Sequence, residues 1–249
     1  MNRVRAAAAL IATLVLTGCS DSEYGPELTR ADVEQLAKEM RVIVGDTPLV
    51  FPRVALAGRY EAKPAPAAGA KLDRIELGVG PYGWSDWQPE IRKICPLLAR
   101  RWVASVCDDP WSPIEQAMPA NNFYLMDRDA IGLFDNHMTV GGEFMSNQLR
   151  AMRLEVGRTE IQCDVDKRSE TRFCTAARPI SPQLVAVWTV WDGERETAQA
   201  MAEREGKAIA TFVRYAIARN EDFGQLLPAM CELRRPEAKE GPNGDPCKR

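Results

Sequence analysis

The sequence predicts an α+β fold in which an antiparallel β-sheet, built as a meander, packs against a long C-terminal helix and a kinked middle helix. Three observations support this class. Residues 152–191 show the clearest alternation of apolar and polar side chains in the chain, as half-buried strands do. Residues 194–219 repeat apolar side chains at helical spacing. Six cysteines form three pairs that are close in sequence, which predicts three local disulfides.

The N-terminus predicts a cleaved leader. An apolar run at residues 6–16 has the length of a signal peptide and is well short of the roughly 20 residues that span a bilayer. The run ends in Leu16-Thr17-Gly18-Cys19, which resembles the lipobox of bacterial lipoproteins: Leu, a small residue, Gly or Ala, then Cys. The resemblance covers residues 1–19. It implies cleavage before Cys19 and attachment of diacylglycerol and a further acyl chain, such as palmitate, to that residue, so that the bilayer itself is a partner.

The same resemblance implies a location. In these lipoproteins an Asp directly after the lipidated Cys favours the inner membrane, and this chain has Ser20 there. We therefore expect the outer membrane, on its periplasmic face, with the inner membrane as the alternative; an ordinary secretory signal with a chance cysteine is the competing interpretation. We expect a signal peptide at residues 1–18 and a lipidated tether at residues 19–28. One globular α+β domain should follow at residues 29–233, and a charged Pro/Gly-rich tail at residues 234–249.

The first elements of the body are a helix and two strands. Thr29 suits an N-cap, with Asp32 as the acid of a weak capping box, and the predicted helix of about 12 residues ends near Gly45-Asp46. Its apolar face is formed by Val33, Leu36, Ala37 and Met40. Residues 49–56 are apolar and interrupted by Pro, which suits an edge strand or a bulge. Residues 72–79 alternate and predict a further strand.

The middle of the chain contains an aromatic stretch and the kinked helix. Tyr82, Trp84 and Trp87 lie within eight residues, Gly80–Trp87, and could line a platform for a sugar or peptide, because aromatic faces stack on apolar ligand faces. The alternative is a loop whose rings cover the end of the core. Residues 89–106 then repeat apolar side chains at helical spacing, with a Pro inside that predicts a kink.

The remaining elements complete the predicted sheet and its covering helix. Short strands are expected at residues 123–126 and 131–134, about a turn at 127–129. The meander follows, with Leu184–Trp191 as its last strand. In the long helix that comes next, Gly206 costs about 1 kcal/mol relative to Ala and suggests close approach to the sheet.

Cysteine counting supports an exported protein. Seven cysteines leave one unpaired, and lipidation of Cys19 removes that anomaly. The connectivity with the lowest entropy cost of loop closure pairs Cys95 with Cys107, Cys163 with Cys174, and Cys231 with Cys247. Each bond would close a loop worth about 3 kcal/mol in the chain-entropy model and would persist in an oxidising periplasm. A metal site is the alternative, but the chain has no Cys-x-x-Cys and only one histidine; we expect neither metal nor cofactor.

Composition and motifs restrict the function. Loss of the leader's two arginines lowers 32 basic residues to 30 against 35 acidic ones, a balance of −5 that gives no reason to expect nucleic acid as a partner. A Ser-His-acid hydrolase would have to use His137, the sole histidine, but the sequence has no Gly-x-Ser-x-Gly motif to supply the nucleophile. Carboxylate pairs that could act as in glycoside hydrolases are Asp127 with Asp129 and Asp164 with Asp166, although such pairs are common in turns.

Three functions are consistent with these observations. The first is an envelope lipoprotein with a non-enzymatic, protein-binding or structural role and another envelope protein as its partner. The second is an enzyme acting on envelope carbohydrate or peptide through carboxylates and the aromatic platform. The third is a periplasmic inhibitor or immunity-type protein.

Overall fold

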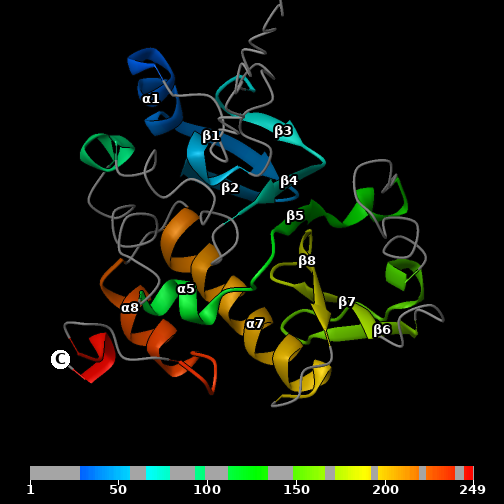
Figure 1. Ribbon diagram of the computed structural model, residues 1–249. Coiled ribbons are helices and arrows are strands. Elements are labelled where there is room, and N and C mark those ends of the chain that lie inside the picture. The colour runs from blue at the N-terminus through cyan, green and yellow to red at the C-terminus, as the bar shows by residue number, and fades with distance from the viewer. Residues whose placement is uncertain are drawn as a thin grey trace, which may run out of the picture.

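Two β-sheets and the helices that cover them form the described part of the protein (Figure 1). The computed structural model describes residues 29–56, 66–78, 93–98, 112–133, 148–165, 172–191, 196–218, 223–238 and 244–248. Its strands are β1 Glu39–Val44, β2 Thr47–Pro52, β3 Ala70–Leu72, β4 Arg74–Leu77, β5 Phe123–Asp127, β6 Glu160–Val165, β7 Arg172–Pro179 and β8 Leu184–Trp191. The described α-helices include α1 Arg30–Ala37, α5 Pro113–Ala117, α7 Ala198–Phe212 and α8 Phe223–Glu232. The predicted α+β class, with antiparallel sheet and a long C-terminal helix, is confirmed.

The smaller sheet has the strand order β2–β1–β3 and follows α1 in the chain. The predicted capping box is present, because Thr29 and Asp32 exchange side-chain and backbone hydrogen bonds at the start of α1. The predicted length of that helix is wrong: it ends at Ala37, and Met40 already lies in β1. Alternate residues of β1 are buried, and the period of two there dictates a strand that pairs with β2 in a hairpin. Among the described strands β2 lies at an edge, as predicted for residues 49–56, but it ends at Pro52 and a 3-10 helix, η1 Arg53–Ala55, follows it.

The larger sheet has the order β4–β5–β8–β7–β6, with every neighbouring pair antiparallel. Its second half is the predicted meander, and β8 has the predicted bounds. The strand expected at 131–134 is wrong, because a 3-10 helix, η4 Arg128–Leu133, occupies this segment. The meander also begins later than expected: Val156 is exposed in a turn before β6, and Gly157 in that turn has φ +82°.

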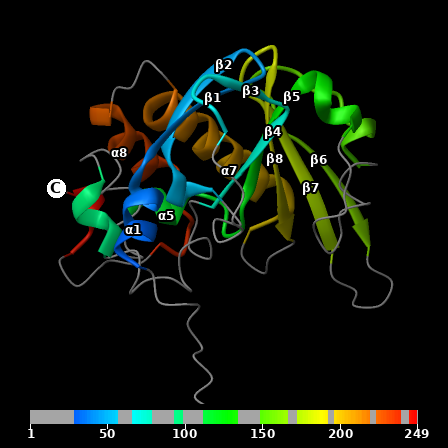
Figure 2. The same ribbon diagram turned by 90° about the horizontal axis from the view of Figure 1, so that it is seen from above.

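Both faces of the larger sheet are covered. Trp188 of β8 and Phe123 of β5 belong to a large apolar core shared with α7, α8 and the smaller sheet. Figure 2 shows α7 lying along this face of the sheet. On the other face, Val185 and Val187 pack in a smaller cluster with residues of η4 and Leu149. The sheet is therefore the central layer, and α7 is its principal cover.

The long C-terminal helix follows the predicted apolar pattern but begins later than predicted, at Ala198, and the sequence pattern did not predict the helix after it, α8. Residues 198–217 are helical, the last turn being a π-helix, η5 Val213–Ile217. The apolar stripe predicted for this helix is buried or partly buried: Met201, Ala202, Ile209, Phe212, Val213, Ala216 and Ile217. α8 then packs against α5 and α7. Of the kinked middle helix only residues 93–98 are described, with a short 3-10 helix, η3 Cys95–Leu97, at the predicted Pro.

Two of the three predicted disulfides are seen, and not three. Cys163 pairs with Cys174 across β6 and β7, and Cys231 at the end of α8 pairs with Cys247. Cys95 is also disulfide-bonded, with a partner outside the described residues, where its predicted partner Cys107 lies.

Candidate functional site

The carboxylate of Glu205 is the centre of the candidate site. Glu205 lies within α7 and is only 4% exposed. α7 begins after Thr197, whose hydroxyl accepts a hydrogen bond from the backbone N–H of Ala200 and so fixes the start of the helix. The indole Nε1 of Trp188, itself fully buried in β8, donates to Glu205 Oε2 over 3.0 Å. A charged group is thus held inside the layer between helix and sheet.

This environment changes how readily Glu205 binds a proton. Burial raises the pKa of Glu205 from its ordinary value of 4.5 to about 7, because the charged form loses its water. The arginines 204 and 235 and the hydrogen bond from Trp188 lower the pKa, and Glu196 raises it slightly. Desolvation is the largest of these effects.

Arg204, the neighbour of Glu205 in α7, contacts both the residue Glu196 before α7 and the end of α5. Its guanidinium donates to both carboxylate oxygens of Glu196, with the shortest contact, from Nη2 to Oε2, at 3.0 Å. The same Nη2 lies 3.7 Å from Glu205 Oε1. Nη1 donates to the carbonyl of Ala117 at the end of α5 over 3.3 Å. The Arg204 and Glu196 side chains are only 12% and 14% exposed, so this is a nearly buried ion pair.

The second arginine of the site, Arg235, follows α8. Its backbone N–H donates to the carbonyl of Gln116, and its Nη2 donates to the carbonyl of Glu115, each over 3.1 Å. Arg204 and Arg235 together therefore satisfy the last carbonyls of α5, which have no partners within the helix. Two arginines at a helix C-terminus are also favourable for the helix dipole.

α7 can approach the sheet this closely because residue 206 is glycine. A Cβ on Gly206 would lie 2.7 Å from Thr159 Oγ1, 3.0 Å from Trp188 Cη2 and 3.1 Å from Arg178 Cδ. The predicted close approach is confirmed. Arg178 in turn donates to Thr159 over 2.9 Å and lies 3.8 Å from Glu203 on α7.

Chemically, the site can bind and release a proton near neutral pH within a fixed frame of charges. Both oxygens of Glu205 already have protein partners, Trp188 and Arg204. A carboxylate with this pKa is suited to acid–base work when a substrate reaches it. At 4% exposure, its immediate chemistry is protonation coupled to the two arginines.

Sequence reasoning missed this site, although a signal was present. Ala202, Glu205 and Ile209 share one helix face at spacings of three and four. A single carboxylate in the middle of an apolar stripe indicates a buried charge that needs partners.

The predicted carboxylate pair at the end of β5 is Asp127 with Asp129, and Asp127 contacts a backbone N–H and a lysine. Asp127 Oδ1 accepts the backbone N–H of Asp129 over 3.1 Å, which starts η4. Its other oxygen lies 3.7 Å from Lys71 Nζ. Asp127 is buried and Asp129 is exposed, so the two carboxylates do not face a common space.

The remaining predicted site residues fall elsewhere. The lipidation residue Cys19, the platform residues and His137 lie outside the described residues, as does Asp166. The platform residues concerned are Tyr82, Trp84 and Trp87. The backbone of Asp164 lies in β6, and its side chain is not described. The predictions for these residues therefore lie outside what the structure describes.

Comparison with known proteins gives no relative: no family model, curated protein or solved structure matches this chain. Within the described ranges, no group of three or more His, Cys, Asp or Glu side chains is arranged to hold a metal ion. None of the helices in that part of the chain has the length and apolar character needed to cross a membrane.

Proposed function

We propose that this chain is a lipid-anchored protein of the bacterial envelope whose body has a non-enzymatic role, binding another envelope protein. The lipobox-like Leu16-Thr17-Gly18-Cys19 supports the anchor and the two disulfides support an oxidising compartment. Two or three acyl chains hold a protein on a membrane durably, whereas one chain does so only marginally. Outer-membrane sorting rests on Ser20.

The observation that carries the non-enzymatic role is the burial of Glu205 among partners from the protein itself. Both of its oxygens have partners within the protein, and Arg204 is likewise engaged by Glu196 and by the carbonyl of Ala117. These contacts join α7 to the sheet and to α5. A domain stabilised in this way can present a binding surface, and binding a protein requires no reactive group.

In vivo cross-linking tests the binding role. Cells carrying the full chain are treated with a short amine-reactive cross-linker, and the membrane fraction is analysed by mass spectrometry. We expect one stoichiometric protein partner in the wild type that is reduced in a Cys19→Ala variant, because the untethered chain leaves the membrane surface. A captured toxin as that partner favours the inhibitor role. A chain that is recovered entirely without partners contradicts the proposal.

The anchor has its own test. Intact-mass analysis of the purified membrane fraction should show a chain that begins at Cys19 and carries acyl groups. Cys19→Ala should be unprocessed and released from membranes, and Cys107→Ala provides a control that removes a cysteine but leaves the anchor. A Cys19→Ala chain that is cleaved normally and stays membrane-bound overturns the lipoprotein assignment. A non-reducing peptide map of the same sample tests the third proposed disulfide, Cys95 with Cys107.

An envelope hydrolase is the second candidate, and the pKa of about 7 at Glu205 favours it. Incubation of purified cell-wall material with the full chain, with soluble fragments followed by mass spectrometry, tests this activity. Fragment release by the wild type that is lost in Glu205→Gln would establish the hydrolase. No release by either protein removes this candidate.

A further inference from the structure

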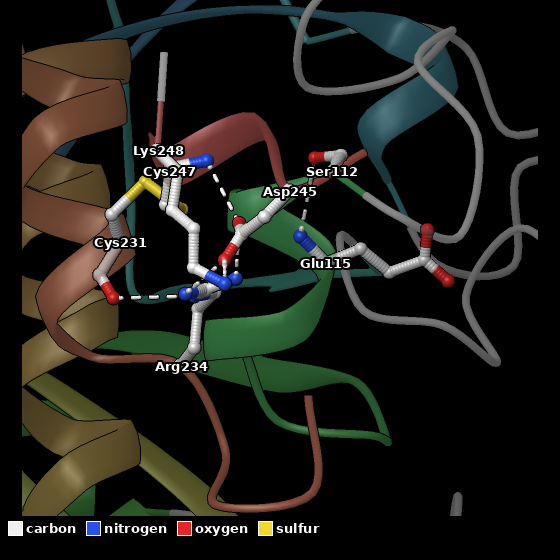
Figure 3. Close-up of a disulfide and its surroundings, with 7 residues drawn as sticks. All are labelled: Ser112, Glu115, Cys231, Arg234, Asp245, Cys247 and Lys248. Carbon is white, nitrogen blue, oxygen red and sulfur yellow. Dashed lines mark hydrogen bonds and ion pairs between the residues drawn. A yellow bond between two sulfur atoms is a disulfide. The ribbon is translucent and has the colours of Figure 1, made fainter. Parts of the chain in front are cut away.

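The chain after α8 returns to the end of that helix at residues 244–248, the C-terminal segment. Cys247 in this segment is bonded to Cys231 in the last turn of α8, at a sequence separation of 16. Figure 3 shows Arg234 and Asp245 pointing toward one another beside this bond. The disulfide therefore forms next to two opposite charges, one close to each of its cysteines.

Arg234 and Asp245 form a two-point ion pair that is largely shielded from water. Nη1 of Arg234 donates to Asp245 Oδ1 over 2.8 Å, and Nη2 donates to Oδ2 over 3.3 Å. The Asp245 side chain is only 6% exposed and that of Arg234 20%, so the pair is stronger than one on an open surface. Nε of Arg234 also donates to the carbonyl of Cys231 over 3.4 Å, where α8 ends. The carboxylate is thus fixed to the helix end that carries one of the two cysteines.

Asp245 also fixes the backbone at Cys247. Its Oδ1 accepts the backbone N–H of Cys247 over 2.9 Å, and its own carbonyl accepts the N–H of Lys248 over 3.1 Å, within the 3-10 helix η6 Pro246–Lys248. The Lys248 ammonium lies 3.7 Å from Oδ2 but is 72% exposed, so it contributes little. The hydrogen bonds from Cys247 and Arg234 lower the pKa of Asp245, so its carboxylate is ionised at neutral pH. One carboxylate therefore connects the position of Cys247 to that of Arg234.

We propose that Asp245 is the positioning residue of the Cys231–Cys247 bond: its carboxylate, held by Arg234, places the Cys247 sulfur against that of Cys231 and so favours closure of the bond. Two groups joined only by a short flexible linker meet at an effective concentration on the order of millimolar. The ion pair raises that concentration, because it removes conformations in which the two sulfurs are far apart. The bond and the ion pair consequently stabilise one another.

The bond forms by thiol–disulfide exchange with a small disulfide as the oxidant. The thiolate of one cysteine attacks the oxidant, which gives a mixed disulfide and releases one thiol. The thiolate of the other cysteine then attacks the protein sulfur of the mixed disulfide, forms the Cys231–Cys247 bond and releases the second thiol. The two cysteines lose two electrons and two protons, and the oxidant gains them as two thiol groups. Asp245 acts on the second, intramolecular step, which depends on how often the two sulfurs meet.

The thiol–disulfide equilibrium of the full chain tests this role. The protein is equilibrated near neutral pH with mixtures of oxidised and reduced dithiothreitol, and peptide mapping after acid quenching and alkylation gives the oxidised fraction of each bond. Asp245→Asn keeps an acceptor for the Cys247 N–H but loses the charge that Arg234 binds, so it should lower the equilibrium constant of Cys231–Cys247 on the order of tenfold. Glu237→Gln, which changes an exposed carboxylate after α8, should leave that constant unchanged.

Two further readouts separate positioning from a general loss of stability. The Cys163–Cys174 bond of the same molecules should keep its equilibrium constant in Asp245→Asn. Arg234→Gln should lower the constant of Cys231–Cys247 by a similar factor, and the double variant should fall little further, because both residues act through one ion pair. An unchanged constant in Asp245→Asn, fully additive losses in the double variant, or an equal weakening of Cys163–Cys174 would each overturn the proposal.

Discussion

At the scale of single residues, the decisive feature is a carboxylate on the buried stripe of α7. Glu205 is stabilised by specific partners, Trp188 and Arg204, but its burial removes the water that would stabilise its charged form. The balance favours the protonated form more in the folded chain than in the unfolded one, where the pKa is 4.5. The stability of the protein should therefore depend on pH through this group.

The first prediction concerns that pH dependence. The folded-state pKa of about 7 is raised, so the contribution of Glu205 is fully present below about pH 4.5 and is lost as pH rises through about 7. At about 1.4 kcal/mol per pKa unit, the change amounts to about 3 kcal/mol. Urea unfolding from pH 5 to pH 8 should show this decline in the wild type and a flatter profile in Glu205→Gln, which exceeds the wild type above pH 7. Parallel profiles for the two proteins would contradict it.

The second prediction concerns Gly206. Gly206→Ala gains about 1 kcal/mol of helix propensity. It also places a Cβ 2.7 Å from Thr159 Oγ1 and 3.0 Å from Trp188, both of which are buried and have little room to move. Overpacking of this kind typically costs 1–3 kcal/mol, so we expect net destabilisation by about 1 kcal/mol in urea unfolding. Gly132→Ala is the matched control, because nothing lies within 4 Å of its Cβ position. A more stable Gly206→Ala would show that α7 can move away from the sheet.

At the scale of elements, the hairpin β6–β7 is joined by a disulfide between residues that are directly opposite in the ladder. Cys163 pairs with Cys174 in the register as well as covalently. β6 is the last strand of the larger sheet among the described elements, so this bond ties an edge strand to its neighbour, β7. A disulfide that closes such a loop stabilises the fold by restricting the conformations of the unfolded chain.

The third prediction follows from that bond. A Cys163→Ala/Cys174→Ala variant should lose about 3 kcal/mol of unfolding free energy, the value expected for a loop of this length. Denaturant unfolding under oxidising conditions measures it. Cys231→Ala/Cys247→Ala, in comparison, should raise protease sensitivity of the segment after α8 with a smaller effect on the cooperative transition, because α8 still packs on α5 and α7. Equal effects of the two variants on both readouts would contradict this assignment.

At the scale of the whole molecule, one apolar core joins the two sheets and the C-terminal helices. Phe51 of β2, Trp188 of β8 and Phe212 of α7 belong to the same buried cluster. An isolated bridge between Leu49 and Ala218 also connects the smaller sheet to the end of η5. The two sheets therefore depend on the same packed helix.

The fourth prediction is cooperative unfolding. Because the sheets share this core, calorimetry at pH 7 should show a single transition in which the calorimetric and van't Hoff enthalpies agree. Phe212→Ala should lower the transition temperature without splitting it, since a large core truncation costs about 3–5 kcal/mol. Two resolved transitions, or splitting in this variant, would mean that the smaller sheet folds on its own.

The sequence by itself determined the class of fold, the meander, β8, the long C-terminal helix, two of the disulfides and the closeness of Gly206 to the sheet. These follow from local periodicity, from cysteine spacing and from the cost of a glycine in a helix. Only the tertiary structure decided that residues 39–44 form a strand, that residues 128–133 form a 3-10 helix, and that Glu205 meets Trp188. Pairing partners and buried charge contacts join residues far apart in the chain, and a local pattern does not specify which distant residue will neutralise a buried carboxylate.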